Sequence, residues 1–314
     1  MKVLTTWTKY LENCNLCPRA CGVNRLAGQA GFCGAVGAQA EVAKTMIHHW
    51  EEPCISGTDP DRGSGTVFFA HCTLRCVYCQ NQAISGRVLD TSKAPNVGKM
   101  DVRTLAQAFL DLQQQGAHNI NLVTPTHYLP MIVPAVSLAR QQGLCLPIVY
   151  NTGGYETKEA VRLLSGTVDI YLCDIKYWTA QTAKAYSLAP NYTDTAWDAL
   201  DAMVQQVGPC VFGEDGMLLR GVVVRHLVLP GRGYAARKIL HRLFQRYGND
   251  IVYSIMNQYT PLANNPGIQA FPELLAPLPQ AEYEEVADFA AGLGLEHAYV
   301  QEGEAISESF IPLW

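Results

Sequence analysis

Short apolar runs alternate with segments of helical periodicity from Gly65 onward. Val, Ile and Leu dominate these runs without polar alternation, which is typical of strands buried on both faces of a parallel sheet. The predicted strands are Thr66–Ala70, Asn119–Val123, Leu146–Tyr150, Val168–Cys173, Val222–Leu229 and Ile251–Ile255. The predicted helices are Thr104–Gln115, Pro130–Gln142, Thr157–Leu164, Ala196–Val207, Ala235–Tyr247 and Gln280–Leu293. This alternation predicts an α/β fold, either a full or partial β/α barrel or an open doubly wound sheet.

The first 64 residues differ in composition from the rest of the chain. They hold five cysteines, two adjacent histidines and several glycines, and they show little periodicity. We therefore predict a cysteine-rich N-terminal extension that binds a metal or cluster at residues 1–64, followed by one α/β domain at residues 65–314.

Charge and cysteine content exclude several classes of function. The net charge is −5 and no long basic run exists, which argues against nucleic acid as a partner. No apolar run approaches the roughly 18 residues of a membrane span, and the first ten residues have no hydrophobic signal core, so we expect a cytoplasmic protein without a membrane partner. Eleven clustered cysteines without an export signal indicate metal ligation rather than disulfides.

Cys72, Cys76 and Cys79 form a C-x3-C-x2-C motif directly after the first predicted strand. Three thiolates on one tight loop can hold three irons of a [4Fe–4S] cube and leave the fourth iron open to bind a small molecule. A zinc knuckle is the alternative, but zinc sites usually need four ligands in paired C-x2-C steps. The motif therefore predicts a [4Fe–4S] cluster whose open iron binds a small molecule that the cluster reduces.

Polar residues follow most of the predicted strands. Active-site residues of β/α barrels lie at the carboxyl ends of the strands, so these positions are candidates for a site. The sequences at those ends are Thr124-Pro-Thr-His127, Asn151-Thr-Gly-Gly154, Asp174-Ile-Lys176 and Asn257-Gln-Tyr-Thr-Pro261. Each could also be an ordinary turn or helix cap.

The cysteine motif resembles the signature of the radical S-adenosylmethionine (SAM) enzymes. Within that superfamily the chain resembles the glycyl-radical-enzyme activating enzymes, in particular the PflX-type homologues of pyruvate formate-lyase activating enzyme. The stretches that carry this resemblance are Cys76-Val-Tyr-Cys-Gln-Asn81, Asn151-Thr-Gly-Gly154, Asp174-Ile-Lys176, Val228-Leu-Pro-Gly231, Cys14-x2-Cys17-Pro-Arg-x-Cys21 and Glu51-Glu-Pro-Cys-Ile-Ser-Gly57. The resemblance implies a partial (β/α)6 barrel with the cluster loop after its first strand.

The resemblance also implies a chemistry. The cluster on Cys72, Cys76 and Cys79 would bind SAM and reduce it to methionine and a 5′-deoxyadenosyl radical, which abstracts hydrogen from a substrate. The expected substrate is a glycine of a partner glycyl radical enzyme, and the expected electron donor is of the flavodoxin or ferredoxin type. Modification of a small molecule or peptide is the alternative, and a non-enzymatic iron–sulfur or zinc electron carrier is a second one.

Carried over by position, the family motifs imply a set of SAM contacts. Tyr78 would lie against the adenine, while Asp174 and Lys176 would face the methionine carboxylate. The family's G-G-E motif, which receives the SAM amino group, is absent, and we assign that task to three residues of the corresponding strand end, Thr124, Thr126 and His127. Asn151, Thr152 and Asp174 match a monovalent-cation site, although Asn151 replaces an aspartate there.

The N-terminal cysteines predict a second metal site. Cys14, Cys17, Cys21 and Cys33 give the spacing C-x2-C-x3-C-x11-C, with several glycines that allow tight turns. Four thiolates close a coordination shell, so this site would hold structural zinc or a second [4Fe–4S] cluster, or the four cysteines are free. Only a cluster could relay electrons.

Substrate contacts are expected from strand-end residues that SAM does not use. These are Arg225 and His226 on the fifth predicted strand and Asn257, Gln258 and Tyr259 after the sixth. Core packing alone does not require such a polar string at a strand end. For Arg225 an ordinary inward charge paired with an acid is the alternative, and for Tyr259 it is a packed ring.

Overall fold

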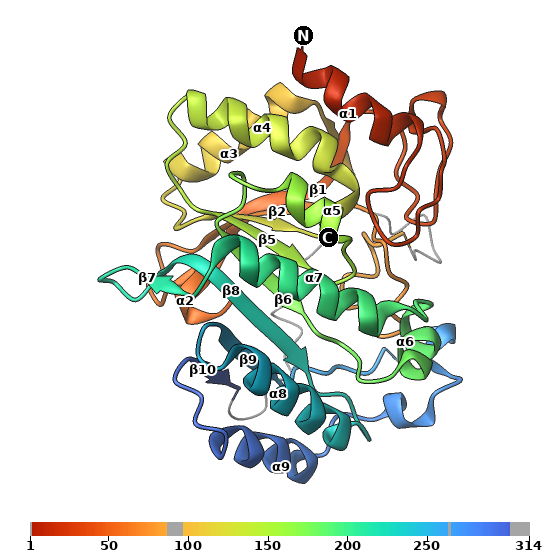
Figure 1. Cartoon of the computed structure of the whole chain (residues 1–314), viewed down its shortest axis with the longest axis vertical. Helices are drawn as coiled ribbons and strands as arrows, with labels where there is room; N and C mark the ends of the chain where they lie inside the picture. The colour runs from red at the N-terminus through yellow and green to blue at the C-terminus, as the bar shows by residue number, and fades with distance from the viewer. Residues whose placement is uncertain (1, 87–96, 263–264, 302–314) are drawn as a thin grey trace.

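One sheet of mostly parallel strands organises the chain (Figure 1). The computed structural model describes residues 2–86, 97–262 and 265–301. The strands are β1 (Ala40–His48), β2 (Ser64–Phe69), β3 (Gly98–Met100), β4 (Ile120–Val123), β5 (Ile148–Thr152), β6 (Ile170–Asp174), β7 (Val211–Phe212), β8 (Leu218–Leu227), β9 (Val252–Met256) and β10 (Ala298–Val300). Their order is β10-β9-β8-β6-β5-β4-β2-β1-β3, with β7 paired to β8.

The six predicted strands correspond to β2, β4, β5, β6, β8 and β9, and each pairs in parallel with the next. A helix follows each of these strands before the next begins, and α9 precedes β10. The prediction of a partial (β/α)6 barrel is therefore confirmed, since the parallel strand order and the crossover helices are both present. Apolar side chains from both faces of the strands form the core.

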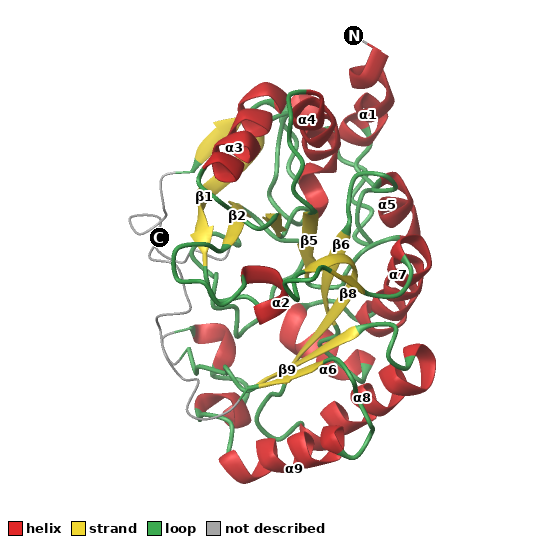
Figure 2. Cartoon of the chain, turned by 90° about the vertical axis from the view of Figure 1, so that its left-hand side faces the viewer, coloured by secondary structure: helices red, strands yellow, loops and turns green. Residues whose placement is uncertain are grey.

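The helices that connect the parallel strands lie on the outer side of the sheet. Figure 2 shows α3, α4, α5, α7, α8 and α9 in an arc around the strands. Local capping fixes several of their starts: Asp101 accepts a hydrogen bond from the amide of Thr104 at α3, and Thr157 does so from Ala160 at α5. The helices are α1 (Lys2–Glu12), α2 (Pro53–Ser56), α3 (Val102–Gln114), α4 (Leu129–Gln141), α5 (Lys158–Leu163), α6 (Ala180–Ser187), α7 (Tyr192–Val207), α8 (Gly233–Tyr247) and α9 (Gln280–Ala291).

The N-terminal extension is joined to the barrel through β1, which the sequence did not predict. This strand pairs antiparallel with β2 on one side and with β3 on the other. Helix α1 packs against α4, and Tyr10 donates a hydrogen bond to Glu159 at 3.0 Å. Residues 1–64 thus share the sheet of the rest of the chain.

None of the helices in the described ranges has the length and apolar character needed to cross a membrane.

Candidate active site

The loop after β2 carries Cys72, Cys76 and Cys79 to the carboxyl end of the sheet. Arg75 holds this loop together, because its Nη1 donates to the carbonyl oxygens of Cys72, Leu74 and Ser85 at 3.1, 3.3 and 3.2 Å. A guanidinium in this position fixes several turns of backbone at once.

The end of helix α6 supports the same loop from the other side. The amides of Arg75 and Val77 donate to the carbonyl oxygens of Ser187 and Tyr186 at 3.2 and 2.8 Å. The hydroxyl of Ser187 donates to Sγ of Cys76 at 2.9 Å. One of the three thiols is therefore held by a side chain more than 100 residues away in the sequence.

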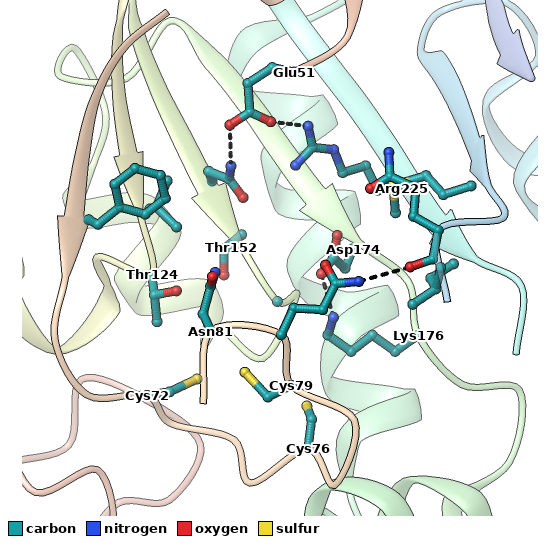
Figure 3. Close-up of a pocket in the computed structure, with 18 of the residues that line it drawn as sticks. Glu51, Cys72, Cys76, Cys79, Asn81, Thr124, Thr152, Asp174, Lys176 and Arg225 are labelled. Carbon is teal, nitrogen blue, oxygen red and sulfur yellow. Dashed lines mark hydrogen bonds and ion pairs between the residues drawn. The ribbon is translucent and has the colours of Figure 1, made fainter. Parts of the chain in front are cut away.

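A cavity of about 380 Å³ opens above the three cysteines. Figure 3 shows the thiols of Cys72, Cys76 and Cys79 on one side of it and the Glu51–Arg225 pair on the opposite side. Between these ends lie residues from the carboxyl ends of the strands, among them Thr124, Asn151, Thr152, Asp174 and Lys176. The volume is within the range of sites for small molecules and cofactors.

Cys72 and Cys79 favour the protonated thiol in the absence of metal. Burial, together with the charge of the neighbouring Cys76, raises the pKa of Cys72 to about 12 and that of Cys79 to about 11. A bound metal centre reverses this preference, because its positive charge stabilises the thiolates and releases their protons.

The donor set fits an iron–sulfur cube with one open iron. No other cysteine lines the cavity in the described part of the chain. Over the same residues, no three His, Cys, Asp or Glu side chains converge closely enough to bind a single metal ion. A cube binds each thiolate at a different iron, so its ligands stand farther apart than the ligands of one ion.

Tyr78 lines the cavity beside the cysteine loop and is buried. Its hydroxyl lies 2.7 Å from that of Tyr177, which in turn is hydrogen-bonded to Ser187. Because Ser187 also donates to Cys76, a chain of hydrogen bonds runs from the Tyr78 ring to a cysteine sulfur. The ring is therefore held in one orientation at the cavity wall.

Asp174 and Lys176 form an ion pair at the end of β6. Their Oδ2 and Nζ atoms are 2.5 Å apart, and both side chains line the cavity. Burial lowers the pKa of Lys176, but the charges of Asp174, Cys76 and two nearby tyrosines together outweigh burial and hold the pKa well above its usual value. Lys176 therefore presents an ammonium group to any anionic ligand in the cavity.

Tyr192 and Gly154 fix the backbone at this point. The Tyr192 hydroxyl lies 2.8 Å from the carbonyl oxygen of Gly153 and 2.9 Å from that of Asp174, and it accepts from the amide of Lys176 at 3.1 Å. Gly154 has φ +78°, and a Cβ there would lie 2.2 Å from the Asp174 carbonyl oxygen. Glycine is required at this crossing of β5 and β6.

The residues predicted to receive the SAM amino group separate in the structure. Thr124 lines the cavity, whereas Thr126 and His127 do not. The short helix of Thr126–Tyr128 turns both side chains into the core, where Thr126 donates to Glu156 at 2.6 Å and His127 Nε2 lies 2.8 Å from the carbonyl oxygen of Ala70. Burial lowers the pKa of His127 to about 3. Of the three predicted residues, only Thr124 is in position to contact a ligand.

Asn151 and Thr152 line the cavity next to Asp174, as the cation-site pattern predicted. Their polar atoms have protein partners, however. The Thr152 hydroxyl donates to Glu156 at 2.5 Å, and the Asn151 amide lies 3.4 Å from Glu51. Lys176 also pairs with an oxygen of Asp174, so each of the three residues of the predicted cation site has a protein partner.

Arg225 lines the cavity and forms a buried ionic cluster with two residues that the sequence reasoning missed. Its guanidinium pairs with Glu51 and, at 2.6 Å, with Glu52. Glu51 also accepts from the amide of Asn121 at 2.7 Å. The charge of Arg225 lowers the pKa of Glu52 although burial opposes this. The sequence signal that could have identified these partners is the pair of adjacent acids at the start of the Glu51-Glu-Pro-Cys-Ile-Ser-Gly57 motif.

The other predicted substrate residues are mostly turned away from the cavity. Gln258 lines it, and its carbonyl oxygen accepts from Gln80 at 2.9 Å. His226 is buried against the carbonyl oxygen of Ile175 at 2.6 Å, and burial lowers its pKa to about 4. The hydroxyl of Tyr259 is bonded to the carbonyl oxygen of Leu274, and Asn257 donates from its backbone amide to Gln301 at 3.0 Å.

Comparisons with known proteins do not assign a function to this chain. No protein-family model matches it. It is 25% identical over 292 residues to the uncharacterized protein MJ0674 of Methanocaldococcus jannaschii, covering 92% of this chain and 77% of that protein.

Two solved structures resemble the fold. One is SuiB of Streptococcus suis bound to the precursor peptide SuiA, with a TM-score of 0.47 and 10% identity over 74% of this chain and 47% of that one. The other is HydG, a maturase of the [FeFe]-hydrogenase, with a TM-score of 0.48 and 14% identity over 82% of this chain and 56% of that one. This chain spans about half the length of either structure, and its fold class rests on its own strand order.

Proposed function

We propose that this protein is a radical SAM enzyme. Cys72, Cys76 and Cys79 would hold a [4Fe–4S] cluster, and SAM would occupy the cavity above them. The observation that carries the proposal is the meeting of three thiols on one loop with a cavity of about 380 Å³ at the carboxyl end of a partial β/α barrel. When bound, the cluster would supply the electron that cleaves SAM to methionine and a 5′-deoxyadenosyl radical.

The residues of the chain would bind and orient SAM. Lys176, held by Asp174, would donate to the methionine carboxylate, and the hydroxyl of Thr124 would accept from the amino group. Tyr78 would pack against the adenine with its hydroxyl fixed by Tyr177.

The proposed substrate is a glycine of a partner glycyl radical enzyme, from which the adenosyl radical takes a hydrogen atom to give 5′-deoxyadenosine and a glycyl radical. This assignment rests on the motif resemblance, and we propose a flavodoxin- or ferredoxin-type protein as the electron donor. A second candidate is a small molecule or peptide. It is favoured by the Glu51–Arg225 pair, which places charged groups at the far end of the cavity from the cysteines.

Reductive cleavage of SAM tests the proposal. The protein is reconstituted anaerobically with iron and sulfide, reduced with dithionite and mixed with SAM, and 5′-deoxyadenosine is measured. The wild type should form it, and a Cys76→Ala variant should not, whereas Cys145→Ala changes an exposed cysteine and should behave as wild type. A fully loaded, reduced protein that forms no 5′-deoxyadenosine would instead support an electron carrier.

A further inference from the structure

Cys14, Cys17, Cys21 and Cys33 form a second group of thiols outside the cavity. The chain doubles back between the first three, because the amide of Cys14 donates to the carbonyl oxygen of Val23 at 3.1 Å and the amide of Gly22 donates to that of Cys14 at 2.9 Å. The fourth joins them through its neighbour, since the amide of Phe32 donates to Sγ of Cys21 at 3.3 Å.

The backbone around this group is shaped to approach sulfur. A Cβ at Gly31 would lie 2.9 Å from Sγ of Cys21. Only glycine therefore allows the backbone at residue 31 to approach Cys21 this closely. Cys14, Cys17 and Cys33 are each 8% exposed, whereas Cys21 is exposed. Cys14 and Cys21 lie close enough to Cys33 for their charges to act on its thiol.

A buried cation lies beside the same thiols. Arg25 is only 1% exposed, and its Nη1 donates to the carbonyl oxygen of His127 at 2.5 Å. Its Nε and Nη2 atoms have no hydrogen-bond partner, and no carboxylate of the described residues pairs with it. The guanidinium lies close enough to Cys33 for its charge to act on that thiol. Its Cζ also lies 5.7 Å from the centroid of the Tyr128 ring, but a ring face offsets a buried charge only in part. A buried charge without an anionic partner is strongly destabilising, so this guanidinium requires an anionic neighbour.

We infer that Cys14, Cys17, Cys21 and Cys33 bind a second [4Fe–4S] cluster and that Arg25 balances its negative charge. Four thiolates outweigh the positive charge of the iron–sulfide core, and each thiol releases its proton to solvent on binding. Three closely spaced cysteines followed by a distant fourth resemble the general arrangement of ferredoxin-type ligands, although the exact intervals differ. Structural zinc more often uses two separate pairs.

The test removes the three cysteines of the first site, so that any metal bound is bound by the second group of thiols. A background variant carries Cys72→Ala, Cys76→Ala and Cys79→Ala, and it is reconstituted anaerobically with ferrous iron and sulfide. We expect about four irons and four sulfides per chain, with the electron paramagnetic resonance (EPR) signal of a reduced [4Fe–4S] cluster. Adding Cys21→Ala should abolish that signal and remove at least one iron, while adding Cys145→Ala should change neither. Both cysteines are exposed, so neither substitution disturbs the core.

Three results would overturn the inference: zinc without sulfide at the site, a background variant that binds no metal, or an unchanged cluster in the Cys21→Ala variant. SAM cleavage by the wild type is measured separately, so failure of the function proposed above is distinguishable from failure of the second cluster.

Arg25 is tested as a positioning and charge-balancing residue in the same background. Arg25→Met should lower the reduction potential of the cluster and speed its loss to an iron chelator at least tenfold, because the reduced state carries one more negative charge. Arg25→Lys keeps the charge and should restore the potential. A lower potential in both variants, or in neither, contradicts the charge-balancing role, and circular dichroism establishes that each variant is folded.

Discussion

Ser187 donates a hydrogen bond from its hydroxyl to Sγ of Cys76 across 2.9 Å. A hydrogen bond to a thiolate stabilises the more negative, reduced state of a cluster more than the oxidised state. Ser187→Ala should therefore lower the reduction potential of a cluster on this loop by roughly 40 mV, which corresponds to about 1 kcal/mol for one electron. An EPR-monitored redox titration measures the shift.

Ser165 provides the matched control for this prediction because it lies in an exposed turn. Ser165→Ala should leave the potential unchanged, and neither substitution should alter the iron content. An unchanged potential in Ser187→Ala would mean that the hydroxyl does not act on the cluster.

Lys176 should contribute to SAM binding through its charge. Lys176→Met removes a charge-assisted hydrogen bond to a carboxylate, which is worth about 1.5–3 kcal/mol, so SAM should bind roughly 10- to 100-fold more weakly. Equilibrium dialysis with the reconstituted protein measures the Kd. Lys238→Met, on the exposed side of α8, is the control and should bind SAM as the wild type does. Equal affinities in the two variants would remove Lys176 from the site.

The central strands could be predicted from the sequence because each contains a short, largely apolar run, whereas their order came from the family resemblance, since the pattern alone also allowed an open doubly wound sheet. β1 was missed because its sequence, AEVAKTMIH, places charged residues among apolar ones and is partly exposed along its length. Helix α6 was missed for a related reason, since AQTAKAYS has few large apolar residues to mark a buried face.

The site itself was predictable only in part. Cys72, Tyr78, Asp174 and Lys176 belong to local motifs, and all line one cavity. The directions of the side chains after β4 were not predictable. The short helix Thr126–Tyr128 turns Thr126 and His127 into the core, whereas Thr124, which precedes it, faces the cavity. The pairing of Glu51 with Arg225 joins residues 174 positions apart, and no local pattern specifies such a contact.

Arg225 should be important for stability as well as for the shape of the cavity. Arg225→Met leaves the carboxylates of Glu51 and Glu52 buried without their cation, which should lower the free energy of unfolding by about 3–5 kcal/mol. Urea unfolding under anaerobic conditions measures this loss. Arg220→Met lies on the same strand, β8, but at an exposed position, and should change stability by less than about 0.5 kcal/mol. Similar losses in both variants would show that the strand, rather than the ionic cluster, is sensitive.

Glu156 should make the protein less stable as the pH rises toward neutrality. Burial raises the pKa of this carboxyl from 4.5 to about 7, although hydrogen bonds from Thr126 and Thr152 oppose the shift. Between these two values the folded protein holds a proton that the unfolded chain has released, so its contribution to stability is present below pH 4.5 and is lost as the pH rises through about 7. At roughly 1.4 kcal/mol per pKa unit, the loss is at most about 3.5 kcal/mol.

Glu156→Gln keeps an oxygen that accepts from Thr126 and Thr152 but cannot ionise. Its free energy of unfolding should therefore fall less than that of the wild type between pH 5 and pH 8, measured by urea unfolding at each pH. Glu284→Gln, at an exposed position of α9, is the control and should follow the wild-type profile. If Glu156→Gln and the wild type show the same pH dependence, Glu156 is already ionised in the folded protein and the prediction is wrong.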